Sequence, residues 1–168
     1  MTCELPEVKI YVGGARDYIS KVDVKMRRVK ETFGKIMVGL PRGLPSHIVG
    51  DLVVCIVSLM NISCTMALAE HICPKVLFTG VPVDYKKVLE LTFGVYVEAY
   101  EGTNNTMAER SAACIALHPA ANVTRSWVLW KIKTRSRARF CNVVKLVTTE
   151  AIINAMNAIA NKVNKIEH

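Results

Sequence analysis

The stretch SHIVGDLVVCIVSLM, residues 46–60, decides how this chain can fold. Apolar residues hold ten of the fifteen positions and lie nearly all round a helix formed here, so this helix has no continuous polar face to turn toward water. Pro45 closes a connector before the stretch, and Ser46 is the N-cap that we expect. We therefore predict a core helix from Ile48 to Met60, which other parts of the chain must cover.

The segment before this helix predicts a second helix of a different kind. From residue 19 onward, apolar residues recur at alternating intervals of three and four, which places them in one narrow stripe along a helix whose other faces are basic. We expect this helix to end near Gly39. Further upstream, VKIYV at residues 8–12 is followed by two glycines and predicts a short strand. The stripe consists of Ile19, Val22, Met26, Val29, Phe33 and Ile36.

The second half of the chain predicts a small antiparallel barrel or meander. Residues 73–87 contain Pro74 and the Gly80-Val81-Pro82 sequence, which favour an ordered linker with a little helix. Four short runs then follow with turn-rich pieces between them, and we expect them to pair with one another and to share a modest core. A terminal helix should begin after Thr149 as its N-cap. The four runs lie near residues 91–100, 112–118, 126–133 and 138–148.

Composition favours an anionic partner and an intracellular location. The 22 lysines and arginines exceed the 14 acids, which gives a net charge of +8 and a pI near 9.3, as is typical of nucleic-acid-binding proteins. The six cysteines form no C-x-x-C pair, so we expect reduced thiols. The start MTCELPEV lacks the features of a signal peptide, and the apolar run 48–60 is too short to span a membrane. We expect a protein of the cytoplasm or nucleus that is not secreted and not in a membrane.

The stretch DVKMRRVKE, residues 23–31, is the first candidate site. On a helix, Asp23, Arg27 and Lys30 stand at positions i, i+4 and i+7 and so form one stripe. One interpretation is that the carboxylate and the two cations face the same ligand. The other is an ordinary helix start, where an acid suits the helix dipole and the cations are solvated. The residues alone favour the second interpretation.

The stretch KIKTRSRAR, residues 131–139, is the second candidate site, because its cations stand at every second position. On an extended hairpin, this alternation would put all of them on one face of the sheet. They would then contact phosphates without reading bases. The alternative is the solvent-facing side of a sheet. The cations are Lys131, Lys133, Arg135, Arg137 and Arg139.

Two further clusters carry no site that we expect to function. Cys64, His71 and Cys73 could supply metal ligands, but their spacing matches no zinc module and a fourth ligand is missing. Cys114 and His118 would share one face of a strand, with no third group to orient the histidine for catalysis.

Taken in order, five motifs of this chain resemble the back half of a copia-type retrotransposon integrase. DVKMRRVKE resembles the E-R-x-x-R-x-x-K-E helix of that family, with Asp23 in the place of the glutamate. LPSHIVGDLVVCIVSLMNISCTMAL resembles its L-P-x-x-x-W helix, and CPKVLFTG its T-P-x-x-L-F-x-G motif. LTFGVYVEAY is similar to the V-F-G-x-x-x-Y-V strand, and CIALHP stands where the family has C-I-x-L-G-Y.

The resemblance implies an α+β chain that contains the end of an RNase H-like integrase core, with its C-terminal strand and helices. Residues 1–72 would be the remnant of this core, 73–90 a linker, 91–148 an SH3-like β-barrel and 149–168 a C-terminal helix. Asp23 would occupy the position of the third metal-binding carboxylate. It would hold a metal only if the missing core carboxylates were supplied, since the two aspartates of the family lie upstream whereas Asp51 and Asp84 lie downstream.

We therefore expect a truncated integrase segment of a retrotransposon polyprotein that is catalytically incomplete. The parent family implies Mg²⁺, and we expect no cofactor for the fragment itself, because two-metal chemistry needs several carboxylates and an aspartate is one methylene shorter than glutamate. The expected partner is DNA, bound without sequence preference through its phosphates, together with self-association or association with the rest of a polyprotein. The alternative is a non-enzymatic basic binding or scaffolding module with a small helical bundle.

Overall fold

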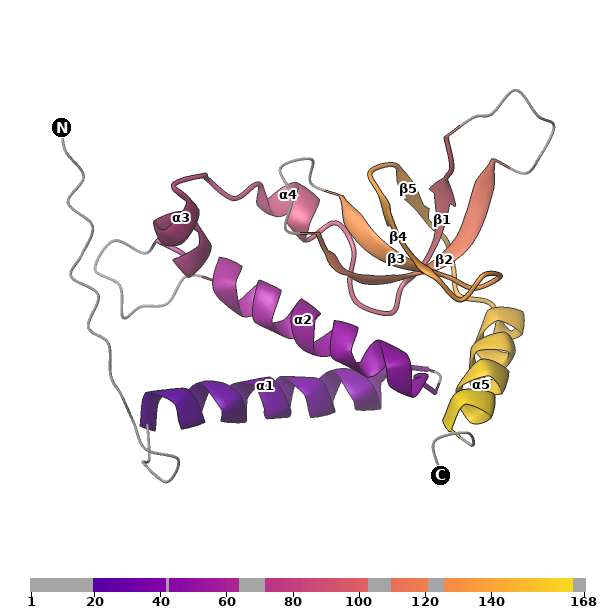
Figure 1. The fold of residues 1–168 in the computed structure, drawn as a ribbon, viewed down its shortest axis with the longest axis horizontal. Helices are drawn as coiled ribbons and strands as arrows, with labels where there is room; N and C mark the ends of the chain where they lie inside the picture. Colours follow the sequence, from indigo (N-terminus) through magenta and orange to yellow (C-terminus); the bar gives the residue numbers. More distant parts are fainter. Residues whose placement is uncertain (1–19, 42, 64–71, 103–109, 121–125, 165–168) are drawn as a thin grey trace.

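The computed structural model describes residues 20–41, 43–63, 72–102, 110–120 and 126–164, and in these ranges the chain is α+β, as the sequence predicts. Five helices accompany one antiparallel sheet in the described part of the chain (Figure 1). None of these helices combines the length and the hydrophobicity that a membrane span requires. The strand expected at residues 8–12 lies outside the described residues.

The predicted helices form near the expected residues, with one correction at the start of the second. Ser46 is the first residue of α2 and not its N-cap; Pro45 holds the N-cap position, without a side-chain cap. The linker contains two short helices, as expected. The bounds are α1 Ser20–Gly39, α2 Ser46–Ile62, α3 Pro74–Thr79, α4 Tyr85–Val88 and α5 Glu150–Asn164.

The sheet contains five antiparallel strands in the order β4-β3-β2-β1-β5. The last of the four predicted runs is divided at Cys141 and Asn142, where the chain leaves β4 and returns to pair with β1 as β5. The prediction of a single fourth strand is therefore wrong. The bounds are β1 Tyr96–Tyr100, β2 Ser111–Pro119, β3 Trp127–Lys131, β4 Arg137–Phe140 and β5 Val143–Lys145.

The central strands β2 and β3 are buried on both faces of the sheet, and their successive residues alternate between two clusters. On β2, Cys114 and Ala116 lie in the cluster that the curled sheet encloses, whereas Ile115 lies in the cluster on the opposite face. The enclosed cluster contains Leu91, Val97, Ala99, Cys114, Ala116, Trp127 and Leu129. Its small alanine and cysteine side chains allow close packing inside the curled sheet.

The opposite face of the sheet packs against α2 and α5. Ile48, Leu52, Cys55 and Ile56 of α2 are at most 1% exposed, and the side chains that they meet come from the sheet and from α5. We expected residues 91–148 to share a core of their own. This holds for the enclosed face of the sheet, whereas the opposite face is covered by α2 and α5, which lie outside that range. The members of this second cluster from the sheet, its flanks and α5 are Phe93, Ile115, Leu117, Ala120, Val128, Trp130, Met156 and Ile159.

Helix α1 packs on the side of α2 that faces away from the sheet, so α2 lies between α1 and the sheet. Figure 1 shows α1 and α2 close together at the connector between them and diverging toward the start of α1. Accordingly, Val29 and Phe33 pack against the core cluster, whereas Val22 and Met26 are about half exposed. The predicted apolar stripe is therefore covered along its C-terminal part and uncovered along its described N-terminal part.

The fold predicts that two positions two residues apart on α2 differ widely in their effect on stability. Leu52→Ala removes a side chain that is fully buried against the sheet, and we expect it to cost about 2–5 kcal/mol of unfolding free energy. Val54→Ala, at a position 46% exposed, should cost less than about 1 kcal/mol. Urea unfolding followed by tryptophan fluorescence measures both, and equal losses would show that α2 is not a core helix.

Candidate nucleic-acid interface

Helix α1 presents its predicted site residues to solvent. The helix places Asp23 in its first turn, and the side chains of Asp23, Arg27 and Lys30 are all exposed. They lie on one stripe, as the spacing predicts. None of the ion pairs within the described part of the chain involves them. The cations of this stripe are available to an anionic partner.

The predicted single face of five cations on the β3–β4 hairpin does not form. Strand β3 ends at Lys131 and β4 begins at Arg137, so residues 132–136 form the turn and the period-two alternation is interrupted. In the register of the sheet, Lys131 pairs with Cys114 and Arg137 with Trp130, and these two partners belong to opposite faces. The expectation that all five cations share a face is therefore wrong.

Lys131 is held, on the face of the sheet that is opposite the helices, by an acid and an aromatic ring. Its ammonium group forms an ion pair with Glu101 and lies 5.5 Å from the centre of the Phe140 ring. Both contacts stabilise a cation, the second through the negative face of the aromatic ring. Lys131 is therefore already paired and is a poor candidate for phosphate binding.

Arg137 is engaged on the helix-covered side of the sheet. Its Nε donates to both carboxylate oxygens of Asp51 at 3.2 and 3.0 Å, and its Nη2 donates to Asp51 Oδ2 at 2.8 Å and to the His47 carbonyl at 2.6 Å. Asp51 is only 8% exposed, so this guanidinium supplies the partner that a buried carboxylate requires. Arg137 fastens the sheet to α2.

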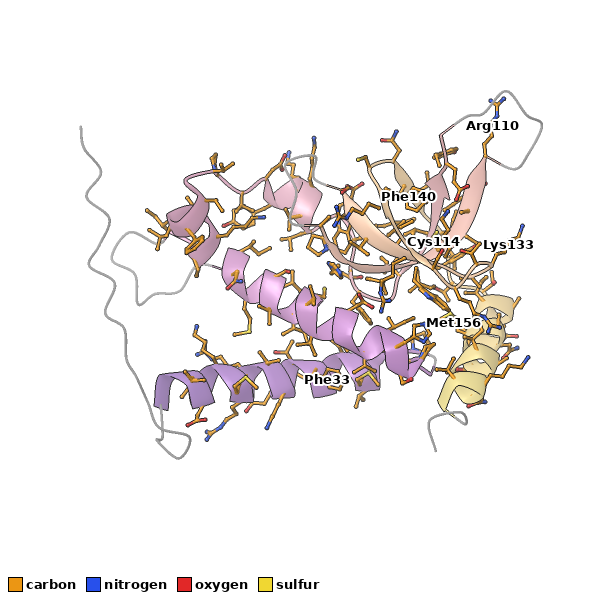
Figure 2. The ribbon with its side chains drawn as sticks, in the orientation of Figure 1. Phe33, Arg110, Cys114, Lys133, Phe140 and Met156 are labelled. Carbon is orange, nitrogen blue, oxygen red and sulfur yellow. The ribbon has the colours of Figure 1, made fainter. Side chains whose placement is uncertain are left out.

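Besides Arg137, three hairpin cations are exposed, at the turn and on β4. Arg135 has a left-handed backbone with φ of 54°, a conformation that glycine adopts without a steric penalty. Arg139 is exposed on the edge strand β4, and Lys133 is exposed in the turn. Figure 2 places Lys133 on the side of α5, far in the view from the N-terminal end of α1. The exposed cations therefore form two separate surfaces.

A β-bulge in β2 separates Cys114 from His118. The register shifts between Ala116 and His118, so Leu117 is an extra residue and His118 pairs with Val128 on the helix-covered face. The expectation that Cys114 and His118 share a face is wrong, because the bulge reverses the alternation. His118 now directs its Nε2 toward Asp51 Oδ1 at 3.6 Å, while its Nδ1 lies 3.1 Å from the Pro119 carbonyl, to which it can only donate.

The buried group around Asp51 is the polar cluster that the sequence does not reveal. Asp51 binds Arg137 and faces His118, and the ring of His47 lies 5.6 Å from the ring of Trp130 in a tilted arrangement. These residues come from α2, β2, β3 and β4. The signal in the sequence was a single acid, Asp51, in a mostly apolar helix. A carboxylate that is buried in such a helix requires a partner.

The described carboxylates do not fit a two-metal site of the kind that the integrase family uses. Both oxygens of Asp51 are bound by Arg137, and Asp84 caps α4 by accepting from the Lys87 amide. Asp23 stands exposed on α1, and within the described ranges no group of three or more His, Cys, Asp or Glu side chains could hold a metal. Cys73 is buried, and Cys64 and His71 lie outside the described residues.

The described cysteines differ in exposure and acidity. Burial raises the pKa of the Cys55 thiol to about 11, and burial also raises that of Cys114 to about 11, a shift that Lys131 opposes and Glu101 reinforces. Because both pKa values exceed the ordinary 9.0, the thiols ionise at a lower pH in the unfolded protein than in the folded protein. The folded state therefore keeps its full stability below about pH 9 and loses stability as the pH rises from about 9 to about 11. Cys141 is exposed between β4 and β5.

The chain matches none of the protein families, curated proteins or solved structures with which it was compared. The resemblance to copia-type integrases therefore rests on the sequence motifs.

The Asp51–Arg137 pair predicts an asymmetric response to substitution. Arg137→Met leaves a buried carboxylate without its main partner and should cost about 3–5 kcal/mol of unfolding free energy. Asp51→Asn should cost about 1.5–3 kcal/mol, because the Arg137 side chain is 48% exposed and can regain water. Arg139→Met, two residues along the same strand, is the matched control and should change stability by less than about 0.5 kcal/mol. If chemical denaturation showed equal losses for Arg137→Met and Arg139→Met, Arg137 would not fasten the sheet to α2 through Asp51.

The cysteines predict selective alkylation of the folded protein. Because the thiolate is the reactive species, Cys55 and Cys114 should react with iodoacetamide only after unfolding, while exposed Cys141 should react in the native state. Peptide mapping by mass spectrometry, with and without urea, measures each site. Native labelling of Cys55 at the rate of Cys141 would show that α2 does not cover the sheet.

Proposed function

We propose that this chain is a nucleic-acid-binding module that derives from a copia-type integrase and does not itself catalyse strand transfer. It binds phosphates without sequence preference, mainly through the exposed cations of α1. The observation that carries the proposal is the charge of this helix. Six cations and two acids lie within Ser20–Gly39, and no cation of α1 whose side chain the structure describes has an ion pair with another described residue.

The physical basis of this binding is the release of counterions from the nucleic-acid backbone. Each lysine or arginine that contacts a phosphate frees a condensed cation, so affinity falls linearly with salt on a log-log scale, by about 0.9 per phosphate on duplex DNA. Cations that an acid already neutralises contribute little. The guanidinium groups of Arg27 and Arg28 add bidentate contacts that lysine cannot make.

The sheet gives the proposed ancestry its structural support. Its small size, its antiparallel strands and the return of β5 to pair with β1 are consistent with the SH3-like barrel that the motifs imply. The proposal of catalytic incompleteness is supported by the engagement of Asp51 by Arg137 and of Asp84 in the cap of α4. We assign no metal-dependent step to these residues.

A scaffolding function is the second candidate, and exposed apolar residues favour it. Val22, Val24 and Met26 on α1 and Val53 and Val57 on α2 are about 40–50% exposed, and a partner or a second copy would cover this apolar surface. Sedimentation velocity over a range of concentrations tests self-association. A monomer that binds DNA favours the first proposal, and a dimer that does not bind DNA favours the second.

The interface predicts which cations determine the salt dependence of DNA binding. Replacing Lys25, Arg27, Arg28 and Lys30 together with Gln should lower the log-log salt slope by up to about 3.6, at about 0.9 for each phosphate contact. Lys131→Gln is the control, because it removes a cation that Glu101 already neutralises; its slope should match that of the wild type.

Fluorescence anisotropy of a labelled duplex at several salt concentrations gives these slopes. Arg135→Gly tests the hairpin surface without disturbing the turn, since glycine suits the left-handed conformation of this residue. An unchanged slope in the α1 variant would show that its cations are only solvated.

A further inference from the structure

A pocket lies where the C-terminal end of α2 meets α3, α4 and the end of β2. Its volume is about 390 Å³, within the range of pockets that bind small molecules. Its walls are mainly apolar and include Ile62, Val88, Pro119 and Ala120, which come from three separate parts of the chain. None of the residues considered above as phosphate contacts lines it.

One aromatic side chain of this pocket is almost fully exposed. Phe78 of α3 is 94% exposed and lines the pocket, so its ring stands at the opening. Phenylalanine exposed to this degree gains nothing from folding, because its apolar surface stays in water. An exposed aromatic ring beside a basic surface is the usual stacking platform for a nucleic-acid base.

The polar groups of the pocket suit an anion. Lys75 lies three residues before Phe78 on α3, so both are on one side of this helix, and Lys75 also lines the pocket together with Asn61. No acid is among the described residues of the lining. Lys86 and Lys87 are exposed on the neighbouring α4, which the Trp127 indole joins to the sheet by donating to the Lys87 carbonyl at 3.4 Å.

We infer that this pocket binds a nucleobase that carries a phosphate. An aromatic ring, an amide and a cation in one apolar pocket match a ligand that combines a flat ring, hydrogen-bonding edges and a negative charge. Phe78 stacks on the base, Asn61 bonds to its edge and Lys75 contacts the phosphate. In a duplex the bases are stacked and paired, so the pocket takes bases from single strands.

This inference rests on the proposed nucleic-acid binding and adds to it a preference for single strands. The exposed cations of α1 contact only the backbone and do not distinguish a strand with bases from one without. The pocket distinguishes the two strands, because stacking requires the base. Comparing a strand that has bases with an abasic strand therefore separates the contribution of the pocket from that of α1.

The test compares two labelled single strands of about 12 nucleotides, a length within the usual site sizes of such proteins. One carries thymine at every position and the other is abasic, with the same number of phosphates. By fluorescence anisotropy, the wild-type chain should bind the thymine strand roughly 5- to 100-fold more tightly. Phe78→Ala should abolish this preference without unfolding the protein, since the ring is exposed. Tyr100→Ala, which removes an aromatic ring 55% exposed on β1, should keep it.

Each outcome separates the inference from the proposed function. Equal binding of the two strands, or a preference that survives in Phe78→Ala, would show that the pocket does not bind the base, while phosphate binding would remain in place. If neither strand binds and the labelled duplex does not bind either, the proposed function fails, and AMP added to ¹⁵N-labelled protein then tests the pocket by itself. Shifts of the amide signals of Asn61, Lys75 and Phe78 would then assign it to free nucleotides. Their absence would overturn the inference.

Discussion

The burial of α2 is the constraint on which the rest of the structure depends. This helix is apolar on almost every side, and it lies between α1 and the sheet, where Ile48, Leu52 and Ile56 are excluded from water. At about 25 cal/mol per Å² of buried apolar surface, such side chains stabilise the fold by roughly 1.5–3 kcal/mol each. Neither α1 nor the helix-covered face of the sheet has another described element that could replace α2. The helices and the sheet are therefore one packed unit.

The Asp51–Arg137 pair gives this apolar interface its orientation. Apolar contacts are non-directional, so α2 could rotate or slide on the sheet at little cost if they acted alone. A carboxylate that is 8% exposed cannot lose its guanidinium partner without a large penalty, and a bidentate bond accepts only a narrow geometry. Since Arg137 also donates to the His47 carbonyl, the first turn of α2 is fixed as well. We attribute the unique register of helix on sheet to this pair.

The sequence predicts those features that depend on local patterns and misses those that depend on pairing. The periodicity of α1 and the apolar run of α2 are local, and both helices are found near their expected bounds. The division of the last run at Cys141 is not visible, because Phe140 and Val143 continue an apolar pattern across it. The bulge at Leu117 appears only once β2 pairs with β3. The pocket is missed for the same reason, since its lining comes from separate segments that only the fold brings together.

The ion pairs of the hairpin cations move the proposed binding surface from the β3–β4 hairpin to α1. In the sequence, the hairpin stretch has the more regular pattern of positive charge. In the fold, Glu101 neutralises Lys131 and Asp51 neutralises Arg137, whereas the described cations of α1 are free of such pairs. From Lys25 to Lys35 a helix advances about 15 Å, the axial distance over which one strand of a duplex rises by roughly four nucleotides. Helix α1 is thus long enough to follow a nucleic-acid backbone, and the pocket beside α3 would add recognition of the base.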